Sequence, residues 1–143
     1  MEINVAADTI SAAEWEVMRI VWTVDRTNAG EIIKQLQAKK QWSESTIKTL
    51  MRRLVQKDLL LTERDGHRFW YSAHYGQNEM MLQVTTNLFG HMCDMHKGQL
   101  LLSLLKATPL STGDIAALQA ELTQKDKTAP EMVPCDCLSE TGC

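Results

Sequence analysis

Three of the four cysteines lie close together near the carboxyl end, in the segment Pro134-Cys-Asp-Cys-Leu-Ser-Glu-Thr-Gly-Cys143. In an extended chain, residues two apart point to the same side, with Cα atoms about 6.5–7 Å apart. The sulfurs of Cys135 and Cys137 can therefore converge on one ion, whereas a disulfide between them would close a small, strained ring. Soft thiolates favour Cu(I) or Zn(II), and three of them suit trigonal copper or an incomplete tetrahedral zinc site. We predict a metal site made by Cys135, Cys137 and Cys143; the alternative is an unstructured tail with incidental cysteines.

A second group of soft ligands occurs in His91-Met-Cys-Asp-Met-His96. This segment lies between two predicted helices, so packing and a helix break explain it as well as a metal site does. We interpret Cys93 as a buried structural thiol and not as a ligand.

A polar and basic strip follows one side of a predicted helix that Ser43 caps and that ends near residues 56–57. The inward side has three-four spacing and comprises Ile47, Leu50, Met51, Leu54 and Val55. The outward side carries Ser45, Thr46, Lys48, Thr49, Arg52, Arg53 and Gln56. Arginine pairs with guanine and glutamine with adenine in the major groove, and hydroxyls reach phosphates or the thymine methyl. This strip therefore has the chemistry of a DNA-reading surface, and the alternative is a merely solubilising face.

The elements around this helix are those of a winged helix-turn-helix. Ser11 and Glu14 form a capping box for a helix at 12–24, and Asn28 caps a shorter helix that ends near residues 39–40. Apolar or aromatic runs at 59–63 and 68–72 flank Arg64-Asp-Gly-His67, which is a strong hairpin signal. A wing of this kind adds phosphate or minor-groove contacts, here from Arg64, His67 and Arg68.

The remainder of the chain has a helical pattern at 78–90, at 97–106 and after Ser111. Five leucines occupy residues 100–105 and leave little polar face for water, so we expect a second copy of the chain to cover them. We predict a DNA-binding domain at 1–75, a helical dimerisation region at 76–126 and a flexible metal-sensing tail at 127–143. The fold class is mostly α with a small β-hairpin wing, followed by C-terminal dimerisation helices.

Composition agrees with one globular domain, or with one small domain and an appended arm. The chain has 143 residues, of which 44% are hydrophobic and 23% charged. Its net charge of −3 conceals a basic stretch at 34–68, where nine Lys and Arg stand against four Asp and Glu. We expect a cytoplasmic protein without a membrane partner, because no secretory signal or long apolar run is visible. No catalytic constellation stands out, so we expect neither an enzyme nor a small organic substrate.

Three segments together resemble the winged-helix repressors of the penicillinase and methicillin-resistance regulator family. They are Ala13-Glu-Trp-Glu-Val-Met18, Trp42-Ser-Glu-Ser-Thr-Ile-Lys-Thr-Leu-Met-Arg-Arg-Leu-Val55 and Phe69-Trp-Tyr-Ser72. The cysteine-rich tail resembles that of the copper-responsive, CopY-type branch, which usually carries two Cys-x-Cys pairs. Here the first pair is intact and Cys143 alone represents the second.

The resemblance implies a homodimeric repressor of a copper-homeostasis operon, bound to an inverted-repeat operator in double-stranded DNA. It also implies release when Cu(I) displaces Zn(II) from the tail cysteines. Three alternatives remain: a β-lactam-type repressor inactivated by proteolysis, a cytosolic copper or zinc thiolate buffer, and a thiol-oxidation switch.

Overall fold

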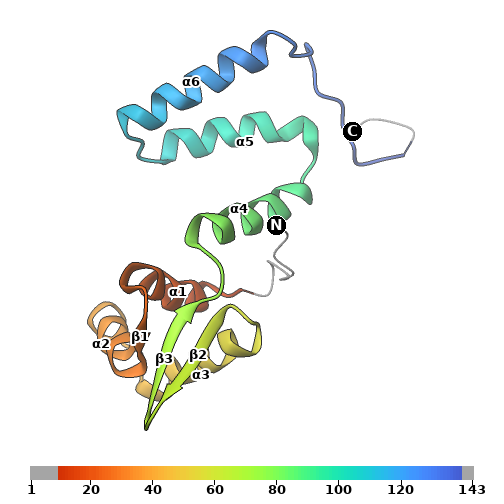
Figure 1. Ribbon diagram of the computed structural model, residues 1–143. Helices are drawn as coiled ribbons and strands as arrows, with labels where there is room; N and C mark the ends of the chain where they lie inside the picture. Colours follow the sequence, from red (N-terminus) through yellow and green to blue (C-terminus); the bar gives the residue numbers. More distant parts are fainter. Residues whose placement is uncertain (1–9, 140–143) are drawn as a thin grey trace. The chain divides into compact units, whose positions relative to one another are not determined.

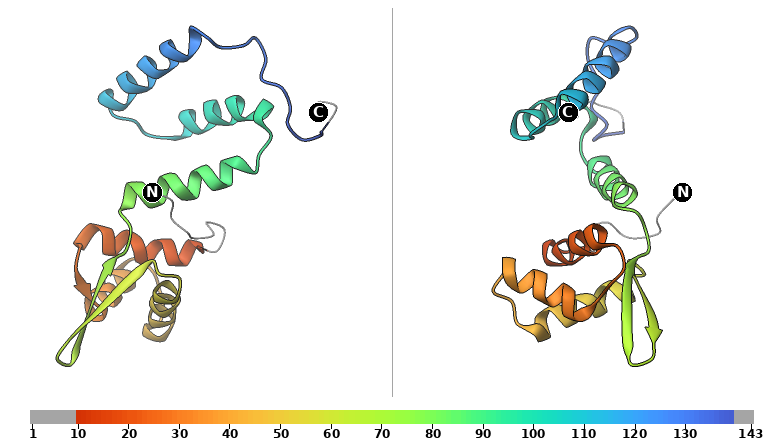
Figure 2. Two further views of the ribbon diagram at one scale, coloured as in Figure 1. Left: turned by 45° about the vertical axis from the view of Figure 1, so that its right-hand side comes forward. Right: turned by 60° about the vertical axis from the view of Figure 1, so that its left-hand side comes forward.

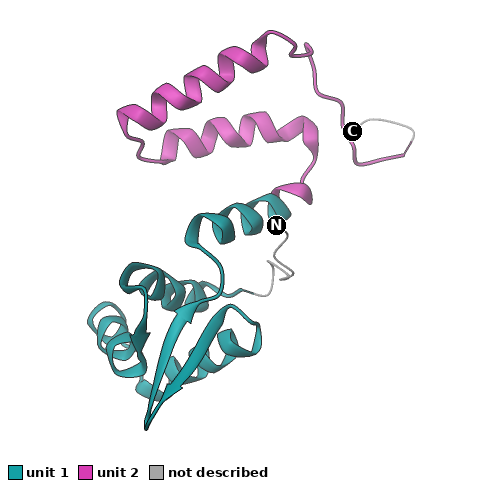
Figure 3. Cartoon of the chain, viewed as in Figure 1, with its two compact units in different colours: residues 1–88 teal, residues 89–143 magenta. Residues whose placement is uncertain are grey.

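The computed structural model describes residues 10–139. The chain divides into two compact units, residues 1–88 and residues 89–143 (Figure 3). The first contains three helices, a small sheet and most of a fourth helix, and the second contains two further helices and the described part of the tail. The predicted domain boundaries at residues 75 and 126 stay predictions.

The first unit is a winged helix, as the sequence predicts (Figure 1). Its elements in chain order are α1 (Ala12–Val24), β1 (Thr27–Asn28), α2 (Ala29–Lys39), α3 (Glu44–Gln56), β2 (Leu60–Asp65), β3 (Arg68–Ala73) and α4 (Gln77–Gly90). Side-chain caps explain where three helices begin. Ser11, Asn28 and Ser43 each accept a hydrogen bond from the backbone N–H three residues later.

The sheet has three antiparallel strands in the order β1-β3-β2. The predicted hairpin forms β2 and β3, and Gly66 has a φ of 65° in its turn, a conformation that glycine adopts without strain. Strand β1 was not predicted. It has only two residues, Thr27 and Asn28, which pair with Tyr71 and Trp70 of β3, and so small an element has no periodicity to detect.

One hydrophobic core holds this unit together. Its buried side chains are Val17, Met18, Ile20, Val21, Ile32, Leu36, Ile47, Leu50, Met51, Leu54, Leu59, Leu60 and Met80. Trp15 and Trp22 of α1 are partly buried at the edge of this core. The indole N–H of Trp22 donates to the carbonyl of Tyr75 at 3.0 Å, which ties α1 to the segment before α4.

A charged pair crosses the edge of the core between α1 and α3. The Nζ atom of Lys57 lies 2.8 and 2.7 Å from the two carboxylate oxygens of Glu14, whose side chain is 3% exposed. Burial favours a raised pKa, but hydrogen bonds from Lys57 and Ser11 outweigh it and hold the pKa of Glu14 below its ordinary value. This pair therefore links the start of α1 to the end of α3.

In the second unit, α5 (Asp94–Ala107) and α6 (Thr112–Asp126) are joined by a short loop (Figure 2). Neither helix has a buried residue. Large apolar side chains are exposed along both, namely Leu101, Leu102, Leu104, Leu105, Ile115, Leu118 and Leu122. Within residues 10–139, every helix is too short or too polar to cross a membrane.

Candidate functional site

The outward side of α3 is exposed as the sequence predicts. Ile47, Leu50, Met51 and Leu54 turn into the core. The opposite side carries the exposed residues Ser45, Thr46, Lys48, Arg52, Arg53 and Gln56, together with the half-buried Thr49. Helix α3 therefore presents hydroxyl, amide and cationic groups to solvent from a backbone that the core holds in place.

Several of these groups already have partners within α3. The hydroxyl of Thr49 donates to the carbonyl of Ser45 at 2.9 Å, and the hydroxyl oxygens of Ser43 and Thr46 lie 2.9 Å apart. Lys48 forms an ion pair with Glu44 one turn earlier, at 2.8 Å. The hydrogen bond and charge of Glu44 raise the pKa of Lys48 above its ordinary value. Contact between Lys48 and an anionic ligand must therefore compete with Glu44.

The wing carries cations of its own. Arg64, His67 and Arg68 are all exposed around the hairpin turn. The guanidinium of Arg64 donates to the carbonyl of Gly66 at 3.0 Å and lies 6.0 Å from the ring centroid of Phe69.

An open hollow of about 390 Å³ separates the wing from α3. Lys48 and Arg52 line it from α3, and Phe69 and Tyr71 line it from β3. Cationic side chains and aromatic rings from two elements thus face the same space. This combination suits a polyanion that also presents flat bases.

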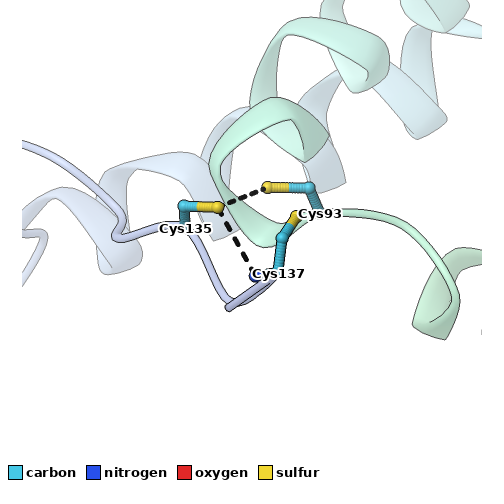
Figure 4. A group of neighbouring side chains, drawn as sticks. All are labelled: Cys93, Cys135 and Cys137. Carbon is cyan, nitrogen blue, oxygen red and sulfur yellow. Dashed lines mark hydrogen bonds between the residues drawn. The ribbon is translucent and has the colours of Figure 1, made fainter. Parts of the chain in front are cut away.

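Three cysteine side chains meet at the start of α5 in the second unit (Figure 4). The Sγ atoms of Cys93, Cys135 and Cys137 lie within 4.8 Å of one another, and those of Cys93 and Cys135 are 3.6 Å apart. The backbone N–H of Cys137 points to the Sγ atom of Cys135 at 3.4 Å. The structure also has Cys135 in a disulfide, so a three-thiolate site requires this cysteine to be reduced.

The Cys137 thiol is held in its neutral form by its neighbours. A hydrogen bond with Cys93, desolvation, and the electrostatic effects of Cys93 and Asp136 raise the pKa of the Cys137 thiol. Adding further thiolate charge to the cluster is therefore unfavourable without a counter-charge. A bound metal ion supplies that charge and takes the place of the protons.

The sequence prediction found two of these three sulfurs. Cys135 and Cys137 converge as the Cys-x-Cys spacing predicts, whereas Cys143 lies outside the described residues. Cys93 was assigned to packing, yet it is only half-buried and belongs to the cluster. Its position in a segment rich in soft ligands was the available signal, but Cys93 precedes Cys135 by 42 residues and only the folded chain brings them together.

Several known proteins are similar to this chain. An uncharacterized 16.5 kDa protein in the ptsI 3′ region of Latilactobacillus sakei is 51% identical over 90% of this chain and 88% of its own length. The methicillin resistance regulatory protein MecI of Staphylococcus aureus is 31% identical over 81% of this chain and 94% of its own length. Bacillus licheniformis BlaI, solved in monomeric form with the blaP half-operator, is 35% identical over 50% of this chain and 87% of that chain, with a TM-score of 0.45.

The sequence profile of the penicillinase repressor family matches residues 10–124. That range contains the whole winged helix together with α5 and nearly all of α6. The chain therefore belongs to the penicillinase repressor family.

Proposed function

We propose that this protein is a homodimeric transcriptional repressor that binds an inverted-repeat operator and releases it when Cu(I) binds its cysteine cluster. The observation that carries the proposal is the convergence of three cysteine sulfurs within 4.8 Å in a chain that also has a winged helix. A repressor that responds only to proteolysis has no use for such a cluster. A thiolate buffer has no use for the polar and basic face of α3.

DNA recognition would rest on α3 and the wing. The proposed DNA-contacting residues are Ser45, Thr46, Lys48, Thr49, Arg52 and Arg53 of α3, with Arg64, His67 and Arg68 of the wing. A recognition helix in the major groove reads base edges, and a neighbouring wing fixes its register through phosphates. Membership of a repressor family supports this assignment, as does the exposure of all these residues except the half-buried Thr49.

Dimerisation would rest on the apolar faces of α5 and α6. Leu101 and Leu102 are 50% and 53% exposed, and Leu122 is 59% exposed, although leucine favours burial. A symmetric dimer covers the same patch on both copies. The dimer also presents two winged-helix domains to DNA, which fits half-sites about 10 base pairs apart.

Copper is the proposed signal because the donors are all sulfur. Soft thiolate ligands select Cu(I), and Zn(II) prefers a fourth ligand to complete a tetrahedron. Cu(I) can drive release only if it binds the DNA-free state more tightly than the DNA-bound state. A 100-fold loss of operator affinity corresponds to about 2.7 kcal/mol of coupling.

The test is a titration of the reduced, full-length protein on a fluorescent palindromic duplex, followed by anisotropy. Cu(I), Zn(II) and hydrogen peroxide are added in separate arms under anaerobic conditions. Release by Cu(I), with Zn(II) neutral or supportive, is the expected result. Release by peroxide alone would refute copper sensing and favour a thiol-oxidation switch, for which the disulfide at Cys135 is the structural argument.

A second experiment distinguishes a DNA-binding repressor from a metal buffer. Ser45, Thr49 and Arg52 are changed to Ala one at a time, and Ser103 of α5 is changed to Ala as the control. Each α3 change should weaken operator binding while leaving Cu(I) binding intact, because the two surfaces share no residue. Unchanged operator binding in all three variants would contradict the assignment of α3.

A further inference from the structure

We propose that Cys93 is the third ligand of an intrachain metal site, so that Cu(I) binding fastens the tail to the first turn of α5. This inference rests on the proposed function and names the ligands through which the metal acts. The Cys-x-Cys pair alone offers two sulfurs, and the fold supplies the third from an element 42 residues earlier.

The geometry of the three sulfurs is close to that of a bound site. A metal–sulfur distance of about 2.3 Å places the sulfurs of a trigonal site about 4.0 Å apart. The observed spacing is 3.6 Å between Cys93 and Cys135, with Cys137 inside the same 4.8 Å group. Side-chain adjustments of about 1 Å or less therefore suffice to bind a metal ion. The disulfide of Cys135 must first be reduced by an added thiol or phosphine, and each of the three thiols then loses its proton to solvent on binding.

The start of α5 is arranged so that Cys93 is directed to the tail. Cys93 occupies the N-cap position, but its side chain makes no capping hydrogen bond. The tail supplies the cap instead, because the Oδ1 atom of Asp136 accepts from the backbone N–H of Asp94 at 3.0 Å. One tail segment therefore caps α5 through Asp136 and brings two sulfurs to Cys93.

A lysine in the first turn of α5 provides nearby positive charge. The Nζ atom of Lys97 lies 2.6 Å from a carboxylate oxygen of Asp94 and 5.4 Å from the ring centroid of Phe89. Lys97 also lines an open hollow of about 350 Å³ together with Cys93. One Cu(I) ion with three thiolates carries two negative charges, which this cation helps to offset.

All ligands of this site come from one chain. The site should therefore bind one Cu(I) ion per chain whether or not the protein dimerises. A monomeric variant should bind Cu(I) with the same affinity as the dimer. If the site were shared between two tails, the monomeric variant would bind Cu(I) more weakly. Fastening the tail to α5 would place the metal signal on the helix that carries the exposed leucines.

The test is a cysteine-protection experiment on the wild-type protein. The chain is reduced, equilibrated with or without one equivalent of Cu(I), pulsed with N-ethylmaleimide and analysed by peptide mass spectrometry. Cys93 should be protected by Cu(I) together with Cys135 and Cys137. If Cys93 reacts at the same rate with and without Cu(I) while the other two are protected, the proposal is wrong.

A competition titration with a chromophoric Cu(I) chelator gives an independent readout. Cys93→Ser should weaken Cu(I) binding by more than about tenfold, as loss of a direct ligand exceeds the usual effect of losing a supporting group. Ser103→Ala on the same helix serves as the control and should bind as the wild type does. Unchanged affinity in Cys93→Ser would overturn the assignment. Operator release is scored separately, so a protein that protects Cys93 but keeps its DNA would refute the proposed function and leave this site standing.

Discussion

Replacing Leu101 with Gln tests whether α5 forms the dimer interface. Leu101 is 50% exposed and shares one side of α5 with Leu104 and Leu105, three and four residues later. Fully burying a leucine side chain contributes about 1.5–3 kcal/mol, so covering its exposed half contributes about 1 kcal/mol. A symmetric dimer contains the change twice. Leu101→Gln should therefore weaken association by about 2 kcal/mol, or about 30-fold in the dissociation constant.

Sedimentation velocity over a concentration series measures this constant directly. The matched control is Ser103→Gln, which introduces the same side chain two residues later, about 200° around the helix. The control should dimerise as the wild type does. On DNA, Leu101→Gln should lower affinity for the full palindrome and leave affinity for a single half-site unchanged, because each winged helix is intact.

Two results would refute this reasoning. Equal dissociation constants for Leu101→Gln and the wild type would show that this side of α5 is not covered by a second chain. A larger effect from Ser103→Gln than from Leu101→Gln would place the interface on the opposite side of the helix. In either case the exposed leucines would need another partner.

Three further predictions concern the winged helix. Glu14→Gln should lower the free energy of unfolding by about 2–3 kcal/mol near neutral pH, because it removes the ion pair between the buried Glu14 carboxylate and Lys57. The pKa of Glu14 lies below its ordinary value of 4.5. The stabilisation by this carboxylate is therefore fully present above pH 4.5 and is lost as the pH falls through the lowered pKa. Urea titrations should accordingly show that the stability of the variant depends less on acid pH than that of the wild type. Arg53→Ala should reduce the log–log salt slope of operator binding by about one per chain, with little change in sequence preference. Glu44→Gln should tighten operator binding in anisotropy assays, because it removes the ion pair that engages Lys48 and a negative charge near the phosphates.

Each of these predictions has an outcome that contradicts it. An E14Q variant with wild-type stability would show that the pair with Lys57 is not stabilising. A salt slope unchanged by R53A would place Arg53 away from phosphate. Weaker operator binding by E44Q would mean that Glu44 contacts DNA or supports α3 more than it restrains Lys48.

The local elements of this protein follow from its sequence because their determinants are local. Ser11, Asn28 and Ser43 begin their helices as expected, since a capping side chain bonds to a backbone N–H only three residues away. The inward stripe of α3 sets its outward face by the same helical period. Cys135 and Cys137 likewise lie close together because only one residue separates them in the chain.

Features that join distant residues required the tertiary structure. Strand β1 exists only because Thr27 and Asn28 pair with β3, and two residues carry no pattern of their own. The contact of Lys57 with Glu14 depends on how α1 packs against α3. Cys93 becomes a candidate ligand only when the tail returns to the start of α5, since nothing in its neighbouring residues specifies a partner so far along the chain. The sequence determines which side chains are available, and long-range packing decides which of them come into contact. The reason is that separation along the chain determines the distance between two residues only within one helix or strand.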